Sequence, residues 1–171
     1  MPKIFISSNR HDAEVAEKLE ARLRQQHLPF WRADSDFYGT PGWPKTIGEA
    51  IAAHDLFLAL WSQHAAISHI IEFEWQMAQL LQRRIIALRL DDAPLREKMQ
   101  PDRHFRWPLA PKAEPDFWAI LRQSAPDFDA DTVQNVIKKL SRFNETKPAQ
   151  VTRKMRIVYF NSRIDNPKME F

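Results

Sequence analysis

The chain has 171 residues, of which 44% are hydrophobic and 27% charged, an ordinary composition for a globular protein of one domain with a tail. The absence of cysteine excludes disulfides and thiolate chemistry, and no apolar run approaches the roughly 18 residues needed to span a bilayer. A strand-like segment starts within the first residues and leaves no room for a signal peptide, so we expect a cytoplasmic protein without a membrane span.

The net charge of +3 is concentrated in the C-terminal part of the chain. Residues 142–171 contain seven basic and three acidic residues, which leaves 18 basic and 19 acidic residues for the rest. A nearly neutral body argues against nucleic-acid binding by the main domain. We therefore divide the chain into a domain at residues 1–142 and a basic tail at residues 143–171, which we interpret as a terminal strand or a linker to a further element.

Short apolar runs, separated by segments with helical periodicity, recur along the first 90 residues. They predict strands at residues 3–7, 28–31, 55–61 and 84–90, with a short edge strand at 105–107 in a stretch that prolines interrupt. The third run is continuously apolar, as is typical of a central parallel strand. Helices are expected at residues 15–23, 44–53, 68–82, 116–124 and 129–142.

This alternation of strands and helices predicts a flavodoxin-like α/β fold, a three-layer sandwich with a central parallel sheet. Folds of this class bind ligands beyond the carboxyl ends of their strands. The loop at residues 34–43 belongs to that edge and holds two of the three glycines, Gly39 and Gly42. We expect unusual backbone angles at both.

One acidic residue lies on the apolar face of the helix at residues 68–82. At about 100° per residue, Glu74 falls near the middle of the sector formed by the apolar residues Ile67, Ile70, Ile71, Met77, Ala78 and Leu81, whereas Glu72 points to the opposite face. A carboxylate facing a core is costly unless it is paired, protonated or open to a cleft. The pattern alone leaves open a salt bridge, with Arg10, Arg83 or Arg84 as partner, a helix edge that reaches solvent, or a functional carboxylate.

Five segments, in the right order, resemble the motifs of TIR (Toll/interleukin-1 receptor) domains, most of all those of bacteria. They are FISS with the following Asp12, the second strand and BB loop ending in PGW at residue 43, the central strand DLFLALWS, the helix start SHIIEFE, and the fourth strand RIIALRLDDAPL. Each motif is weak alone, but the ordered set is specific. The resemblance covers residues 1–123, extends towards 142, and implies the TIR fold.

The resemblance implies two kinds of function. Many TIR domains cleave the nicotinamide–ribose bond of NAD+ and release ADP-ribose or a cyclic variant, in innate immunity and bacterial antiphage defence. Others are noncatalytic scaffolds that act through TIR–TIR contacts. The glutamate of the family's W-C-x-x-E motif maps onto Glu74, which is then the catalytic residue. NAD+ is then the substrate, and neither a cofactor nor a metal is implied. Ser8 and Arg10 are implied to lie beside the substrate, and Trp43 to bind it by helping to close the BB loop; the alternatives are a core position for Trp43 and a solvated loop position for Arg10.

The chain departs from the family where the Trp-Cys pair is replaced by Ile70 and Ile71. Ile70 thereby takes the substrate-facing position, and Trp75, Phe37 or His69 are candidates for the missing aromatic face. The implied partners are NAD+, further copies of the TIR domain, and a sensor protein or domain; we expect no nucleic acid to bind the TIR domain and no membrane partner.

Other active-site motifs are absent. There is no G-x-G-x-x-G, P-loop or G-x-S-x-G sequence, which argues against ordinary dinucleotide binding, nucleotide hydrolysis by a P-loop, and a serine hydrolase. His64, His69 and Glu72 do not have the spacing of a zinc site.

Overall fold

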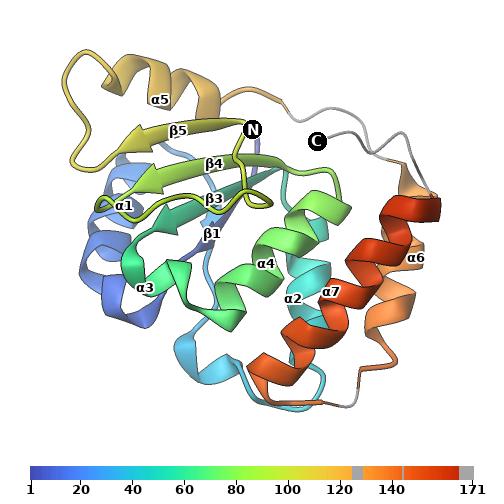
Figure 1. The fold of residues 1–171 in the computed structure, drawn as a ribbon. Helices are drawn as coiled ribbons and strands as arrows, with labels where there is room; N and C mark the ends of the chain where they lie inside the picture. Colours follow the sequence, from blue (N-terminus) through green and yellow to red (C-terminus); the bar gives the residue numbers. More distant parts are fainter. Residues whose placement is uncertain (125–128, 144, 166–171) are drawn as a thin grey trace.

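The computed structural model describes residues 1–124, 129–143 and 145–165, with side chains described up to Arg156 (Figure 1). Its centre is a five-stranded, all-parallel sheet of order β2-β1-β3-β4-β5. The strands are β1 (Ile4–Ser7), β2 (Phe30–Trp31), β3 (Leu56–Trp61), β4 (Arg84–Arg89) and β5 (Arg103–Arg106). The chain first moves outward from β1 to β2 and then returns to the other side of β1. The carboxyl ends of β1 and β3 therefore border a topological switch point.

The strand predictions are confirmed, with differences at the edges. β3 pairs with β1 and β4 and is buried along its whole length. β2 is only two residues long, because Pro29 before it has no N–H to donate, although its carbonyl accepts from the Ile4 N–H at 3.0 Å. β5 is the expected edge strand but begins two residues earlier, at Arg103.

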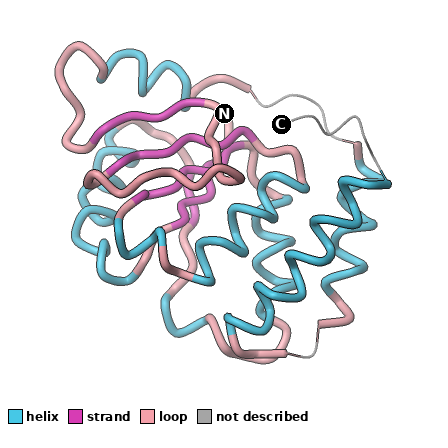
Figure 2. Tube along the Cα trace, viewed as in Figure 1, coloured by secondary structure: helices cyan, strands magenta, loops and turns pink. Residues whose placement is uncertain are grey.

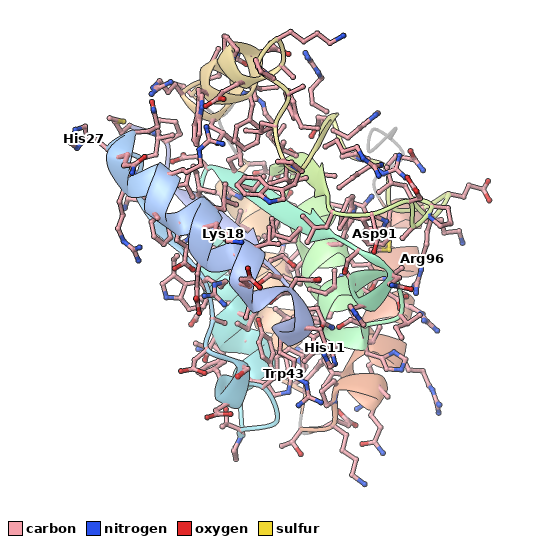
Figure 3. The ribbon with its side chains drawn as sticks, turned by 90° about the vertical axis from the view of Figure 1, so that its left-hand side faces the viewer. His11, Lys18, His27, Trp43, Asp91 and Arg96 are labelled. Atoms are coloured by element: carbon pink, nitrogen blue, oxygen red, sulfur yellow. The ribbon has the colours of Figure 1, made fainter. Side chains whose placement is uncertain are left out.

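Helices cover both faces of the sheet (Figures 1 and 2). In chain order the helical elements are η1 (Arg10–Asp12), α1 (Ala13–Gln25), η2 (Ser35–Phe37), α2 (Trp43–Ala52), α3 (Gln63–Ala66), α4 (His69–Leu80), α5 (Glu114–Leu121), α6 (Ala130–Leu140) and α7 (Pro148–Asp165). Figure 3, turned by 90°, looks onto α1, with His11 and His27 near its two ends. No helix within the described residues is long and apolar enough to cross a membrane.

Alternating side chains of the strands divide the core in two. On β1, Ile4 and Ile6 pack with α1 and α5, whereas Phe5 packs with α2 and α4. The face of α2 and α4 carries the larger aromatic cluster, which includes Trp43 and Trp75. This same face of the sheet is covered by two layers of helices, because α6 packs on α2 and α7 packs on α4.

The C-terminal segment differs from the expected strand or linker. Residues 148–165 form α7, whose Val151 and Met155 are fully buried in the cluster that contains α4. These residues are four apart, the spacing of one helical face, while Arg153 and Lys154 between them are exposed. A pair of apolar residues is too short a pattern to identify a helix in a basic segment, and packing on α4 supplies the missing stabilisation. The division at residue 142 stays a prediction.

Candidate active site

Glu74 lies at the carboxyl end of β1, on the second turn of α4. Its side chain is 1% exposed, and Ser7, the last residue of β1, is equally buried. The Ser7 hydroxyl donates to Glu74 Oε2 at 2.5 Å. The strand end and the helix start thus meet at one hydrogen bond, directly beside the switch point of the sheet.

The second oxygen of Glu74 accepts a hydrogen bond from Tyr38. This tyrosine follows η2 in the glycine-containing loop, and its hydroxyl donates to Glu74 Oε1. Gly39 and Gly42 have φ values of +94° and +78°, which confirms the unusual backbone angles expected for this loop. The Tyr38 ring packs edge-on against Trp43, with 5.4 Å between the ring centroids. Burial and the neighbouring Glu74 charge raise the pKa of Tyr38 well above its ordinary value, so it remains a hydrogen-bond donor.

Burial raises the pKa of Glu74 from its ordinary 4.5 to about 7, although the hydrogen bonds from Ser7 and Tyr38 favour the charged form. The hydrogen bonds of Glu74 within the described residues come from hydroxyl groups, and it makes no salt bridge there with Arg10, Arg83 or Arg84. A desolvated carboxyl group without a cationic partner therefore changes its protonation state near neutral pH.

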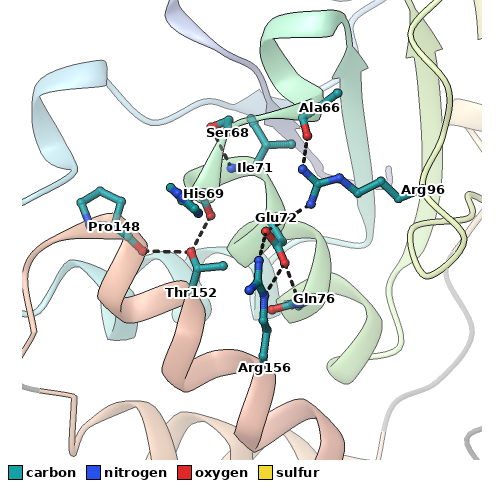
Figure 4. Close-up of polar contacts among 10 residues, drawn as sticks. All are labelled: Ala66, Ser68, His69, Ile71, Glu72, Gln76, Arg96, Pro148, Thr152 and Arg156. Atoms are coloured by element: carbon teal, nitrogen blue, oxygen red, sulfur yellow. Dashed lines mark hydrogen bonds and ion pairs between the residues drawn. The ribbon is translucent and has the colours of Figure 1, made fainter.

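The helical wheel placed Glu72 on the face of α4 that points away from the apolar sector. The structure shows that this face is buried as well. Glu72 is 7% exposed and binds Arg156 of α7 through both oxygens, at 2.8 and 2.9 Å, and Arg96 at 3.2 Å (Figure 4). Burial raises the pKa of Glu72, but the two arginines outweigh it and hold the value below the ordinary range. By contrast Ile67, placed on the apolar stripe, is 77% exposed because it precedes the helix.

Two adjoining pockets lie at the carboxyl edge of the sheet, and Glu74 itself lines neither of them. The first has a volume of about 270 Å³ and the second about 300 Å³. They share five lining residues, Asn9, Arg10, Ser68, Ile70 and Pro148. Tyr38 lines the first pocket, so its side chain separates that pocket from Glu74.

Three of the four expected substrate-binding residues line the first pocket: Ser8, Arg10 and Ile70. Trp43 lines neither pocket. It begins α2, is fully buried, and donates its indole N–H to the Thr146 carbonyl at 2.9 Å. The structure therefore places Trp43 behind Tyr38, where it supports the tyrosine ring.

The candidates for the missing aromatic face have different positions. Trp75 is fully buried in edge-on contact with Phe57 and Trp61, and Phe37 packs against the core. His69 is exposed and lines the second pocket. Of the three, only His69 lines either pocket.

Some residues of the candidate site had no separate signal in the sequence. Tyr38 lies in the loop already marked by its glycines, but its contact with Glu74 depends on how the loop folds back. Arg32 lines the first pocket yet is paired with Glu20 at 2.6 Å. Two motif residues, Asp12 and Ser62, turn out to hold the site together, because the Ser62 hydroxyl donates to Asp12 Oδ2 at 2.6 Å.

The family comparison agrees with this architecture. The family model for the TIR domain matches residues 4–134, and the chain belongs to the TIR domain family. The match ends within α6, so α7 lies beyond it. A search of curated proteins found no match.

Proposed function

We propose that the chain is a TIR-domain NAD+ nucleosidase in which Glu74 is the catalytic residue. One observation carries the proposal: a buried carboxyl group with a pKa of about 7 is held by two hydroxyls, and one of these belongs to a residue that lines a pocket. Perturbed carboxyl groups at such positions are typical of catalytic sites.

The reaction needs little from the protein besides charge stabilisation. The bond between the ribose C1′ and the nicotinamide nitrogen breaks, and its electron pair leaves with nicotinamide. The carboxylate form of Glu74 stabilises the positive charge that develops on the ribose, as in glycoside hydrolysis. A water oxygen then bonds to C1′ and releases a proton, which gives ADP-ribose. Attack by a hydroxyl group of the ADP-ribose itself gives a cyclic product.

Tyr38 has to move for the substrate to reach Glu74. We propose that a ribose hydroxyl replaces the Tyr38 hydroxyl as the donor to Glu74 Oε1. Tyr38 lies in the loop beside Gly39 and Gly42, and no atom lies within 4 Å of a Cβ built on either glycine, so the backbone at these two positions is not packed against other elements. Ser8, Arg10 and Ile70 then line the path of the substrate.

The wider role follows from the family resemblance. We propose an effector or signalling protein of bacterial antiphage defence that uses cytoplasmic NAD+ as its substrate, without a cofactor. TIR–TIR self-association and a sensor protein or domain are the proposed partners. The alternative is a noncatalytic TIR scaffold. It is favoured by the loss of the Trp-Cys pair at Ile70 and Ile71 and by the closed position of Tyr38 over Glu74.

The test is nicotinamide release from NAD+ by the concentrated 171-residue chain, with the oligomeric state measured in the same buffer. Glu74→Gln keeps the side-chain shape and removes the charge. Glu97→Gln makes the same change at an exposed position and is the matched control. Release by the wild type and the control, but not by Glu74→Gln, supports the nucleosidase. No release from an assembled wild-type protein favours the scaffold.

A further inference from the structure

The second pocket is rich in cationic and titratable side chains. Its nine lining residues include Arg10 and three of the six histidines of the chain, His11, His64 and His69. The other five are Asn9, Ile67, Ser68, Ile70 and Pro148, so no carboxylate lines the pocket within the described residues. All four cationic or titratable side chains are exposed. None of them forms an ion pair with a described residue.

The fold brings these side chains together from three separate segments. His11 belongs to η1 after β1, His64 to α3 after β3, and His69 begins α4. The rings of His11 and His64 are stacked, with 4.6 Å between their centroids and 29° between their planes. Asn9 donates to the His64 carbonyl at 3.4 Å and so links the first two segments.

The chemistry of this pocket fits an anion rather than a metal. No group of three or more His, Asp or Glu side chains in the described part of the chain is arranged to hold a metal ion. Asp91 lies close enough to His64 for their charges to interact, but its two oxygens accept the backbone N–H groups of Gln63 and Ala93, each at 2.9 Å. Imidazole and guanidinium N–H groups form charge-assisted hydrogen bonds with phosphate oxygens.

The two pockets adjoin each other, since Arg10 and Ile70 line both of them.

We propose that the second pocket is a diphosphate subsite, in which Arg10, His11, His64 and His69 bind the two phosphates of an ADP-ribosyl group. The proposal rests on the proposed function, because it assumes that the ribose next to the diphosphate occupies the first pocket. It adds a basis for selecting dinucleotides over nicotinamide riboside, which has no phosphate.

The subsite can be tested by binding, without turnover. We would titrate the full chain with inorganic pyrophosphate and with ADP-ribose by calorimetry, and compare it with the double variant His11→Asn/His64→Asn. His104→Asn is the matched control, since His104 is exposed on β5 and lines neither pocket. We expect the double variant to bind both ligands at least about ten-fold more weakly, with an unchanged melting temperature, and the control to bind as the wild type does.

Three results would overturn the subsite: no binding of either ligand by the wild type, equal weakening in the control, or a histidine effect on pyrophosphate but not on ADP-ribose. If NAD+ is cleaved, the double variant should raise KM for NAD+ and leave kcat/KM for nicotinamide riboside unchanged. If NAD+ is not cleaved but ADP-ribose binding depends on the histidines, the nucleosidase proposal fails and the binding site stands.

Discussion

The two glutamates of α4, Glu72 and Glu74, are both buried, but they differ in their hydrogen-bond partners and in the direction in which their pKa is shifted. Glu72 faces α7 and is neutralised by Arg156 and Arg96, which hold its pKa below the ordinary value. Glu74, two residues later, faces the sheet and accepts hydrogen bonds from two hydroxyl groups among the described residues, and its pKa rises to about 7. The same side chain in the same helix is therefore a structural anchor on one face and a titratable group on the other.

The difference lies in what each neighbouring element contributes. α7 brings a guanidinium group that compensates the charge of Glu72 and ties the helix in place. The end of β1 and the glycine-containing loop bring neutral hydroxyls, which orient Glu74 but leave its charge uncompensated. A carboxyl group of the second kind can stabilise positive charge on a substrate, because no cation among the described side chains is paired with it.

The largest expected effect is on activity. Glu74→Gln should lower NAD+ cleavage at least about a hundred-fold, since it removes the charge that stabilises the transition state. Glu72→Gln, the identical change two residues away, should lower it only a few-fold through loosened packing. The measurement is kcat/KM from nicotinamide release. Equal losses in both variants would show that the two faces of α4 do not differ in function.

The second prediction concerns the pH dependence of stability. The raised pKa of Glu74 means that the folded state binds its proton more tightly than the unfolded state does. Its stabilising contribution is thus present below pH 4.5 and is lost as the pH rises through about 7. Relative to Glu74→Gln, the wild type should lose about 3 kcal/mol of unfolding free energy between pH 4.5 and pH 8. Urea unfolding at several pH values measures this, and parallel curves would contradict it.

Glu72 should show the opposite sign. Its lowered pKa provides stability above the ordinary value of 4.5 that is lost as the pH falls through the lower folded value. Near neutral pH, Glu72→Gln should cost about 2 kcal/mol, because Arg156 and Arg96 lose a charged acceptor. Thermal and urea unfolding test this, with Glu97→Gln as the exposed control. If the Glu72→Gln variant is as stable as the wild type, the ion pairs of Glu72 with Arg156 and Arg96 do not anchor α7 to α4.

The smallest effect is expected for Tyr38→Phe, which keeps the aromatic ring and removes one donor to Glu74. That hydrogen bond favours the charged carboxylate, so its loss should raise the pKa of Glu74 further. The acid limb of the kcat/KM profile should move to higher pH, and activity at pH 7 should fall roughly three- to ten-fold. A rise in activity with an unmoved profile would instead identify Tyr38 as a simple barrier to the substrate.

The sequence also predicted parts of the site. The family resemblance implied that Ser8, Arg10 and Ile70 contact the substrate, and all three line the first pocket, where the loop after β1 meets the start of α4. The helical wheel placed Glu74 on the buried face of α4 for a local reason, its spacing from Ile71 and Met77. Trp43 was different: its large apolar ring can lie at a pocket or in the core, and only the packing against Tyr38 and Phe73 decides between them.

By itself, the sequence determined the family, the parallel sheet and the burial of Glu74, because strand runs, helical periodicity and motif order are properties of neighbouring residues. Only the tertiary structure decided the partners of the two glutamates, because Tyr38 and Arg156 are far from α4 along the chain. It also decided that the C-terminal segment is a helix covering α4. Contacts of this kind depend on the path of loops and on packing between layers, which local patterns do not specify.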